Sequence, residues 1–405
     1  MGVKLDRIFD NFIKEGLFKN KFSLQTNYTP ENIPHRDKQI EQIASILAPV
    51  LKLEKVSNVF IYGKTGTGKT LSMQYVRNEL LKKAAKLGIN LNIEYINCKL
   101  KKVADTEYRI LTELIRKFGG DVPSTGLPTD VVYNRFIELL ERKKQLFILI
   151  LDEIDQAVKK ISDDFLYNLT RLNSELNKSQ IALIGISNDL TFLDLLDPRV
   201  RSSLSEEELV FPPYNAAQLK DILENRSREA FKDNVIGEGV IEKCAALAAR
   251  EHGDARRALD LLRVAGELAE REGNKVVGIS DIDKANDKIE RDKVLDVIES
   301  EPKQFQMVLW AIIKLIEENK PGERGGIFTG DVYNQYQEVC KKLKIETLTQ
   351  RRVGDIIAEF DMLGIINATV ISKGRHGRMR EITLSIQKPL LEKAKKIINA
   401  SLEID

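Results

Sequence analysis

Apolar runs and amphipathic stretches alternate through the first half of the chain. The runs Val59–Tyr62, Asn92–Ile96, Leu146–Leu151 and Ile181–Ile186 are short and rich in apolar residues, as buried strands are. The segments between them have helical periodicity, and from Asp37 onward apolar residues recur at the spacing of one helix face. Buried strands separated by helices predict an α/β domain with a mostly parallel sheet that is covered on both faces.

The second half of the chain predicts two further regions. From 216 to about 293 every segment has helical periodicity, and one apolar stripe comprises Ala258, Leu259, Leu262, Ala265 and Leu268. The third region, from Pro302, has helical segments at 304–318, 330–343 and 349–363, followed by β-type runs at 366–373 and 381–386. Three helices and a hairpin in this order predict a C-terminal winged-helix domain. The predicted domains are therefore 1–214, with an N-terminal extension 1–27, then 215–298 and 299–405.

Composition narrows the class of protein. The 405 residues include 63 Lys and Arg against 61 Asp and Glu, a net charge of +2, with 42% hydrophobic residues. These values exclude a disordered chain and provide for a large core. No apolar run approaches the ~20 residues of a membrane helix, and the N-terminus lacks the apolar core of a signal peptide. Cys98, Cys244 and Cys340 are too widely spaced to favour a disulfide framework or a zinc site. We expect a soluble intracellular protein.

A glycine-rich segment joins the first predicted strand to the next helix. It matches the phosphate-loop pattern G-x-x-x-x-G-K-[ST] at Gly63, Lys64, Thr65, Gly66, Thr67, Gly68, Lys69 and Thr70. Glycines let backbone N–H groups surround phosphate oxygens, and the helix N-terminus adds a positive dipole. Lys69 is expected on the β- and γ-phosphates of ATP, and the Thr70 hydroxyl on Mg²⁺.

Two later strands end in polar residues. Asp152 and Glu153 follow an apolar strand, so both carboxylates are expected at the sheet edge where ligands bind in open α/β folds. Asp152 would hold Mg²⁺ and Glu153 would polarise the attacking water. Asn188 ends the next strand and could contact the γ-phosphate or the water, or form an Asx-turn instead. For Asp155, a helix cap or a solvated carboxylate remains an alternative to a role in the site.

These motifs, in this order, resemble AAA+ ATPases, and more narrowly the archaeal replication initiators related to subunits of the eukaryotic origin recognition complex and to its helicase-loading partner. The resemblance extends from about residue 20 to 390. Beyond the phosphate loop it is carried by Asn32–Asp37, Leu151–Asp155, Asp197–Leu204, Val210–Tyr214 and His252–Asp260. It implies an all-helical lid between the ATPase domain and the winged helix.

The resemblance also implies roles that spacing alone does not. Pro34 and Arg36 would line the adenine pocket, and Tyr214 and Arg226 would contact nucleotide. Arg256, in Gly-Asp-Ala-Arg, would be the second sensor, which reaches from the lid to the phosphates, although a solvated helix face is the alternative. Arg199 and Arg201 are candidates for an arginine finger, with Arg199 favoured and a structural ion pair as the alternative. This chain has Ser203 where the eukaryotic relatives tend to carry an arginine.

The winged-helix region has the features of a DNA reader. Between 341 and 380 nine basic and four acidic residues give a local charge of +5, so the remaining chain carries about −3 and the near-zero average hides this region. The first turn of the predicted third helix would meet base edges, and the hairpin tip would meet phosphates or a minor groove. The candidate DNA-binding residues are Thr349, Gln350, Arg351, Arg352, Lys373, Gly374, Arg375, His376, Arg378 and Arg380.

We therefore expect an ATP-dependent replication initiator that binds double-stranded origin DNA and helps to recruit or load the replicative helicase. ATP binding and slow hydrolysis, with Mg²⁺, would act as a conformational switch. Other initiator paralogues on DNA are further expected partners, and the expected location is the cytoplasm, at the nucleoid. Two alternatives remain: an ATP-gated winged-helix transcription regulator, and an AAA+ loader whose winged helix contacts protein only.

Overall fold

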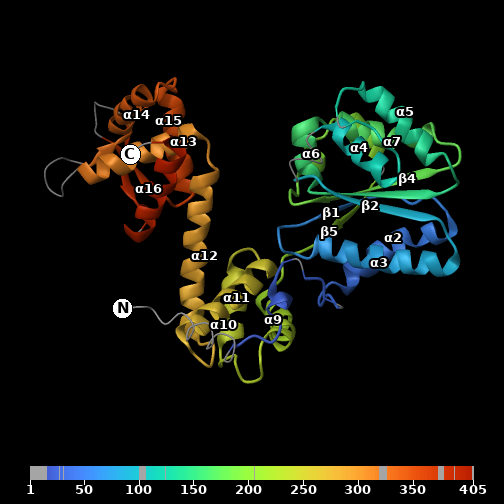
Figure 1. The fold of residues 1–405 in the computed structure, drawn as a ribbon, viewed down its shortest axis with the longest axis horizontal. Helices are drawn as coiled ribbons and strands as arrows, with labels where there is room; N and C mark the ends of the chain where they lie inside the picture. The colour runs from blue at the N-terminus through green and yellow to red at the C-terminus, as the bar shows by residue number, and fades with distance from the viewer. Residues whose placement is uncertain are drawn as a thin grey trace, which may run out of the picture. The chain divides into compact units, whose positions relative to one another are not determined.

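The chain divides into two compact units, Met1–Ile282 and Asp283–Asp405. The computed structural model describes residues 16–26, 28–30, 32–99, 106–123, 125–204, 206–318, 326–372, 378–386 and 388–403. The first unit contains an α/β domain and a helical lid, and the second is a winged helix (Figure 1).

A five-stranded sheet forms the centre of the α/β domain. Its strands are β1 (Asn58–Tyr62), β2 (Leu91–Asn97), β3 (Leu146–Asp152), β4 (Gln180–Ser187) and β5 (Glu206–Val210), in the order β2-β3-β4-β1-β5. All neighbouring strands are parallel, which confirms the predicted sheet. The sequence pattern missed β5 because it begins with three glutamates. This strand pairs on one side only, so an edge position tolerates those charges.

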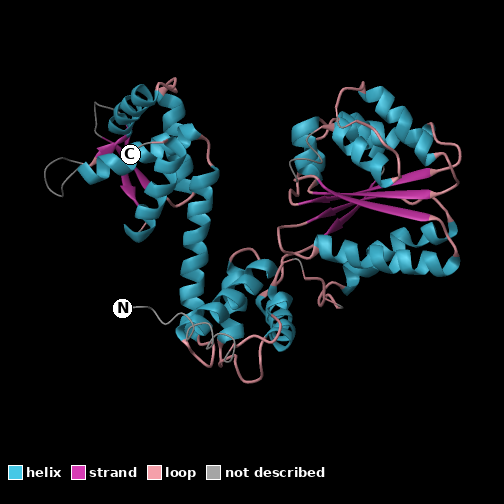
Figure 2. Ribbon diagram, viewed as in Figure 1, coloured by secondary structure: helices cyan, strands magenta, loops and turns pink. Residues whose placement is uncertain are grey.

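Helices cover both faces of this sheet (Figure 2). On one face lie α2 (Asp37–Leu47) and α3 (Lys69–Leu87); on the other lie α4 (Glu107–Lys117), α5 (Thr129–Leu140), α6 (Ile154–Ile161) and α7 (Asp164–Arg171). The remaining short helices of this domain are η2 (Ala48–Lys52), η3 (Leu172–Ser174), η4 (Phe192–Leu195) and α8 (Pro198–Leu204).

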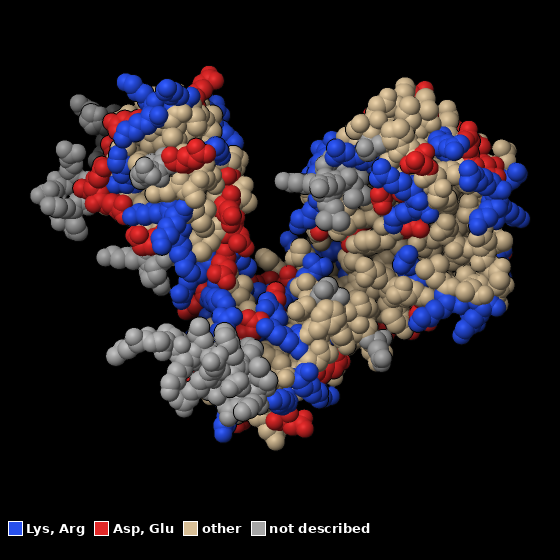
Figure 3. Space-filling model, in the orientation of Figure 1, with Lys and Arg blue, Asp and Glu red and all other residues tan. Residues whose placement is uncertain are grey.

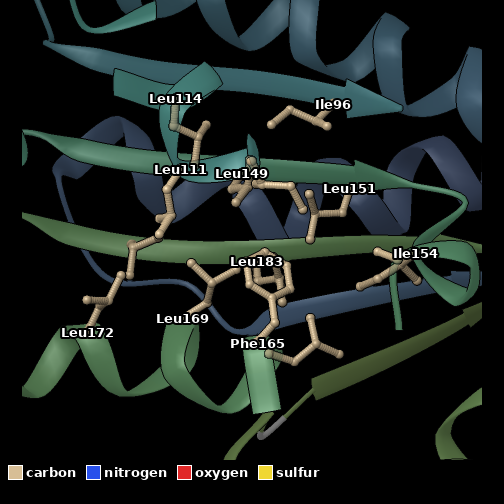
Figure 4. Packing of buried hydrophobic residues seen from close by; sticks show 14 of the residues in the cluster. Ile96, Leu111, Leu114, Leu149, Leu151, Ile154, Phe165, Leu169, Leu172 and Leu183 are labelled. Carbon is tan, nitrogen blue, oxygen red and sulfur yellow. The ribbon is translucent and has the colours of Figure 1, made fainter. Parts of the chain in front are cut away.

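Successive side chains of a strand enter two separate cores, which explains why β3 is apolar throughout. Leu149 and Leu151 pack against α4 and α7 (Figure 4), whereas Ile148 and Ile150 belong to the core on the α2 and α3 face. All four side chains are fully buried. Each such burial stabilises the fold by about 1.5–3 kcal/mol, and together they hold the carboxyl end of β3 rigidly in place.

The lid comprises α9 (Ala216–Ala230), α10 (Val240–Arg250), α11 (Ala255–Glu272) and the start of α12 (Ile279–Ser300). An N-terminal segment that ends in η1 (Lys21–Leu24) packs against it, because the N–H groups of Lys19 and Asn20 both donate to the carbonyl of Ala230. Phe18 stacks on Phe231 at a centroid distance of 4.5 Å. The first residues that the structure describes are therefore part of the lid.

The second unit confirms the predicted winged helix. It contains α13 (Lys303–Glu318), β6 (Ile327–Phe328), α14 (Thr329–Leu343), α15 (Gln350–Met362), β7 (Ile366–Ser372), β8 (Arg378–Leu384) and α16 (Lys388–Leu402). The antiparallel sheet has the order β6-β8-β7. We predicted neither β6, which is only two residues long, nor α16. The hairpin tip 373–377 lies outside the described residues.

Charged side chains of both signs are interspersed on the face that Figure 3 presents. The net charge of +2 is therefore an average over many local patches rather than the absence of charge. Within the part of the chain that the structure describes, no helix combines the length and the apolar character needed to cross a membrane.

Candidate nucleotide site and winged-helix surface

A cavity of about 1150 Å³ opens beside the phosphate loop, the carboxyl end of β3 and the lid. Most of the residues that we predicted for nucleotide binding line it. They are Pro34, Thr65, Gly66, Thr67, Gly68, Lys69, Thr70, Asp152, Glu153, Asn188, Tyr214, Arg226 and Arg256. Arg36, Gly63, Lys64 and Arg199 are not among the lining residues. The structure thus brings segments more than 200 residues apart to one site.

Lys69, on the first turn of α3, is held by three oxygen acceptors. Its Nζ donates to the carbonyls of Gly63 (2.7 Å) and Lys64 (2.8 Å) and to Oδ1 of Asn188 (2.9 Å). The residue is only 5% exposed. Burial lowers the pKa of Lys69 from 10.5 to about 8, although the nearby Asp152 carboxylate acts in the opposite direction. A buried ammonium with weak neutral partners is suited to a phosphate ligand.

The Asp152 carboxylate is oriented by donors from three elements. Oδ2 accepts from the Thr70 hydroxyl (2.9 Å) and from the Tyr95 hydroxyl (2.6 Å). Oδ1 accepts from the Glu153 N–H (3.0 Å). Glu153 has φ 56° and ψ 46°, an uncommon left-handed backbone that is typical of strained functional turns. Because magnesium prefers carboxylate and hydroxyl oxygens, Thr70 and Asp152 fit this ion.

Arg36 lies behind the phosphate loop instead of facing the cavity. Its Nε donates to the carbonyl of Thr67 (2.8 Å) and its Nη2 to that of Pro212 (2.6 Å). The guanidinium carbon lies 3.8 Å from the centre of the Tyr214 ring, a cation–π contact. Burial lowers the pKa of Arg36. In this arrangement Arg36 connects the phosphate loop to the segment that leads into the lid.

The lid touches the phosphate loop through the start of α11. Asp254 caps this helix by accepting from the N–H groups of Arg256 (2.7 Å) and Arg257 (3.3 Å). The Thr65 hydroxyl donates to the same carboxylate (3.3 Å), and the Ala255 N–H donates to the carbonyl of Gly66 (3.2 Å). The capped turn therefore presents Arg256 to the cavity.

Gly66 is the residue that permits this close approach. Its φ is +67°, and a Cβ there would lie 1.7 Å from Oδ1 of Asp254. Any side chain at this position would push the start of α11 away from the loop. Neither Asp254 nor the reason for glycine at 66 follows from the phosphate-loop pattern, in which this position is free.

Arg226, on α9, is buried against the same cavity. Its guanidinium carbon lies 4.5 Å from the ring centre of Tyr28. Among the described residues its Nη1 has no hydrogen-bond acceptor, and the closest carboxylate oxygen, on Glu229, is 3.9 Å away. Burial lowers the pKa of Arg226. Because buried donors are normally satisfied, this orientation fits a polar ligand in the cavity.

Three further candidates of this unit, Asp155, Arg199 and Arg201, are not among the residues that line the cavity. Asp155 is 4% exposed and accepts from the hydroxyl of Ser187 (3.2 Å), so it connects α6 to the residue that precedes Asn188 instead of remaining solvated. The Arg199 side chain is 83% exposed and pairs with Asp197 (Nε to Oδ1, 3.1 Å). Arg201 pairs with Asp194 (2.9 Å). Both arginines are thus in surface ion pairs in the isolated chain.

In the winged helix, α15 presents polar side chains at its first turn. Thr349 caps the helix by accepting from the Arg352 N–H (3.3 Å), and Gln350, Arg351 and Arg352 are exposed. Arg380, on β8, approaches the same helix, with Nη1 3.4 Å from the carbonyl of Gly354. The predicted wing residues Lys373, Gly374, Arg375 and His376 lie outside the described residues, as does the side chain of Arg378.

A phosphate loop on a parallel sheet, a helical lid and a winged helix define a class, the AAA+ ATPases with a Cdc6-type lid. Family models agree along the chain. The AAA domain matches residues 54–192, the Cdc6 AAA+ ATPase-type lid domain matches 220–287, and the CDC6 C-terminal winged helix domain matches 296–394.

Relatives narrow the class to one family. The ORC1-type DNA replication protein of Pyrococcus abyssi is 52% identical over 389 residues, which are 95% of this chain and 91% of that protein. ORC1-type DNA replication protein 1 of Archaeoglobus fulgidus is 50% identical over 388 residues, 96% of this chain and 93% of that protein. The solved structure of the Aeropyrum pernix ORC1 protein in complex with DNA is 43% identical, with a TM-score of 0.80 over 95% of this chain and 97% of that chain.

The chain belongs to the ORC1-type DNA replication proteins. This confirms the resemblance and the fold class predicted from the sequence. Family membership also supports nucleotide binding and ATPase activity.

Proposed function

We propose that this protein initiates DNA replication by binding origin DNA, with ATP as the ligand that controls its conformation. The observation that carries the proposal is the convergence of Lys69, Asp152 and the lid residue Arg256 on one cavity. A ligand that contacts both the phosphate loop and the lid would stabilise one position of the lid relative to the loop. Differential affinity for that arrangement is what a switch requires.

Each residue at the cavity then has a role toward nucleotide. Lys69 binds phosphate oxygens, and Thr70 and Asp152 hold Mg²⁺, which supplies charge neutralisation at the phosphates. Glu153 polarises the attacking water, and Asn188 positions it. Pro34, Tyr214 and Arg226 contact the nucleotide, with Arg36 behind the loop. Arg199 acts as an arginine finger on a neighbouring subunit, and leaves Asp197 to do so.

Hydrolysis has a direct test. Glu153→Gln keeps the shape of the side chain but cannot accept a proton from water. We expect ATP affinity to stay within about threefold of the unaltered chain and turnover to fall about 100-fold or more. Calorimetry measures the first quantity and phosphate release the second. Unchanged phosphate release would remove Glu153 from this role.

The winged helix would be the main DNA reader, through Gln350, Arg351 and Arg352 in the major groove and the 373–380 hairpin on the backbone. Support comes from the exposed first turn of α15 and from the similar Aeropyrum pernix ORC1 protein, whose structure contains DNA. The replicative helicase and other initiator paralogues on DNA are the proposed protein partners, and the nucleoid is the proposed location. We keep 1–214, 215–298 and 299–405 as the proposed domain boundaries.

Footprinting on chromosomal fragments separates this proposal from its alternatives. Protection of repeated elements near a replication origin is the expected result. Protection confined to promoters would favour an ATP-gated transcription regulator instead. No protection at any fragment, by a chain that binds ATP, would favour a loader whose winged helix contacts protein only.

A further inference from the structure

Tyr95 is the one donor to the Asp152 carboxylate, among those the structure shows, that belongs to no nucleotide-binding motif. It lies on β2, whereas Thr70 belongs to the phosphate loop and the Glu153 N–H to the turn after β3. Its hydroxyl is 2.6 Å from Oδ2 of Asp152. A hydrogen bond this short to a carboxylate is of the charge-assisted kind, which is roughly twice as strong as a neutral one.

The sheet register places this hydroxyl. β2 pairs with β3 so that Asn97 is opposite Asp152 and Tyr95 opposite Ile150. Residues two apart on a strand share a face, so Tyr95 and Asn97 lie on the same face of β2. The Tyr95 ring packs against the core on the α2 and α3 face. The ring is therefore fixed by apolar packing, and its hydroxyl reaches the end of the neighbouring strand.

The polar end of the Tyr95 side chain lies at the cavity. Tyr95 and Asn97 line it together with Thr70, Asp152 and Glu153. Lys117 further anchors the strand, because its Nζ bonds the Tyr95 carbonyl (3.3 Å) and Glu94 (2.8 Å).

We propose that Tyr95 is a positioning residue for the magnesium site, because it holds the Asp152 carboxylate in the orientation that binds the metal with nucleotide. This rests on the proposed ATP function. Without the hydroxyl, the one remaining donor to Oδ2 of Asp152 among the described residues is Thr70, and the carboxylate gains rotational freedom. Loss of a hydrogen bond that orients a metal ligand typically reduces metal affinity or activity about 10- to 100-fold.

Tyr95→Phe tests the proposal because it removes the hydroxyl and keeps the ring in the core. Calorimetry on the full chain would measure ATP affinity with Mg²⁺ and with EDTA. We expect the affinity in EDTA to be unchanged and the gain on adding Mg²⁺ to shrink about 10-fold. Turnover at saturating ATP should recover partly at high Mg²⁺. A purely structural role would lower the midpoint of thermal unfolding without changing the ratio of the two affinities.

Tyr108→Phe is the matched control. The Tyr108 hydroxyl donates to the carbonyl of Pro123 at 2.7 Å and does not line the cavity. This variant should keep the full magnesium effect. If Tyr95→Phe keeps the full gain in ATP affinity on adding Mg²⁺, the proposed role of Tyr95 is wrong but the nucleotide function is not affected. A failure of the unaltered chain to bind ATP would overturn the nucleotide function, and the role of Tyr95 with it.

Discussion

The nucleotide site and the first turn of α15 use charged residues in opposite ways. Lys69 and Asp152 are each 5% exposed and are held by hydrogen bonds of 2.6–3.0 Å. Arg351 and Arg352 are exposed. The Asp355 carboxylate with which Arg352 pairs is 4.0 Å away, which is longer than a hydrogen bond. The two regions belong to the same chain, yet one is prearranged and the other is solvated.

The difference fits the size and charge density of the proposed ligands. A triphosphate is small, so a site can surround it with oriented groups before it arrives, and burial makes each interaction stronger. Duplex DNA is a long polyanion that remains partly solvated, so its binding gains from counterion release and needs accessible cations. We expect substitutions in the first region to have large, specific effects and those in the second to have small, salt-dependent effects.

Lys69→Ala should have the largest effect. It removes the only buried ammonium that lines the described part of the cavity. Truncating one member of a buried charged pair costs about 2–5 kcal/mol, or about 30- to 5000-fold in affinity. Calorimetry should therefore detect little or no ATP binding, whereas DNA affinity without nucleotide should stay unchanged. ATP affinity close to that of the unaltered chain would contradict the assignment of the phosphate loop.

Gly66→Ala should have the next largest effect. The new Cβ would overlap Asp254 and displace the start of α11, so ATP affinity should fall about 10-fold as Arg256 moves away. Gly88→Ala is the control, because Gly88 has the same φ of +67° but no atom within 4 Å of the added Cβ. Both variants should lose about 1–2 kcal/mol of stability from the left-handed backbone alone. Equal ATP affinities in the two variants would show that contact between loop and lid is irrelevant to binding.

The pH dependence of ATP binding should be smaller. Because burial lowers the pKa of Lys69 to about 8, the nucleotide-free protein loses this charge above pH 8, and binding must then take up a proton. We expect affinity about fourfold weaker at pH 8.5 than at pH 7. The same pKa shift means that this group makes the nucleotide-free fold more stable as pH rises from about 8 toward 10.5. Calorimetry at pH 8.5 in two buffers of different ionisation enthalpy should detect proton uptake, and its absence would refute the mechanism.

Sequence patterns predicted the fold correctly where the residue types in a segment are compatible with a single structural role. Apolar β3 can only be buried, so this strand was predicted correctly. The phosphate-loop pattern is short and local, and its segment lies between a strand and a helix as expected. The edge strand β5 was missed because its glutamates conceal the strand period. Arg36 was placed at the cavity by resemblance, but the direction of its side chain depends on the carbonyls of Thr67 and Pro212.

Contacts between segments that are distant along the chain could not be predicted from local sequence patterns. In the sequence Tyr95 is an ordinary strand residue. In the structure the register of β2 and β3 brings its hydroxyl to Asp152. From the sequence alone Asp254 is at most a helix cap. In the structure it also lies against Gly66 of the phosphate loop. In both cases the contact depends on distances across the fold, which no local pattern encodes.

The most direct test of the contrast is the salt dependence of DNA binding by Arg351→Ala, with Arg352→Ala as its matched variant. The Arg352 guanidinium lies 5.9 Å from the Phe305 ring centre and 4.0 Å from Asp355, so among the described residues Arg352 has more partners within the protein than Arg351. Fluorescence anisotropy of the full chain on origin DNA would measure affinity against salt concentration. We predict that Arg351→Ala reduces the log–log slope by about 0.9, because a cation in the major groove also neutralises phosphate charge and releases counterions. We expect a smaller change for Arg352→Ala and unchanged ATP affinity in both variants. A slope identical to that of the unaltered chain in both variants would contradict a DNA-reading role for this turn.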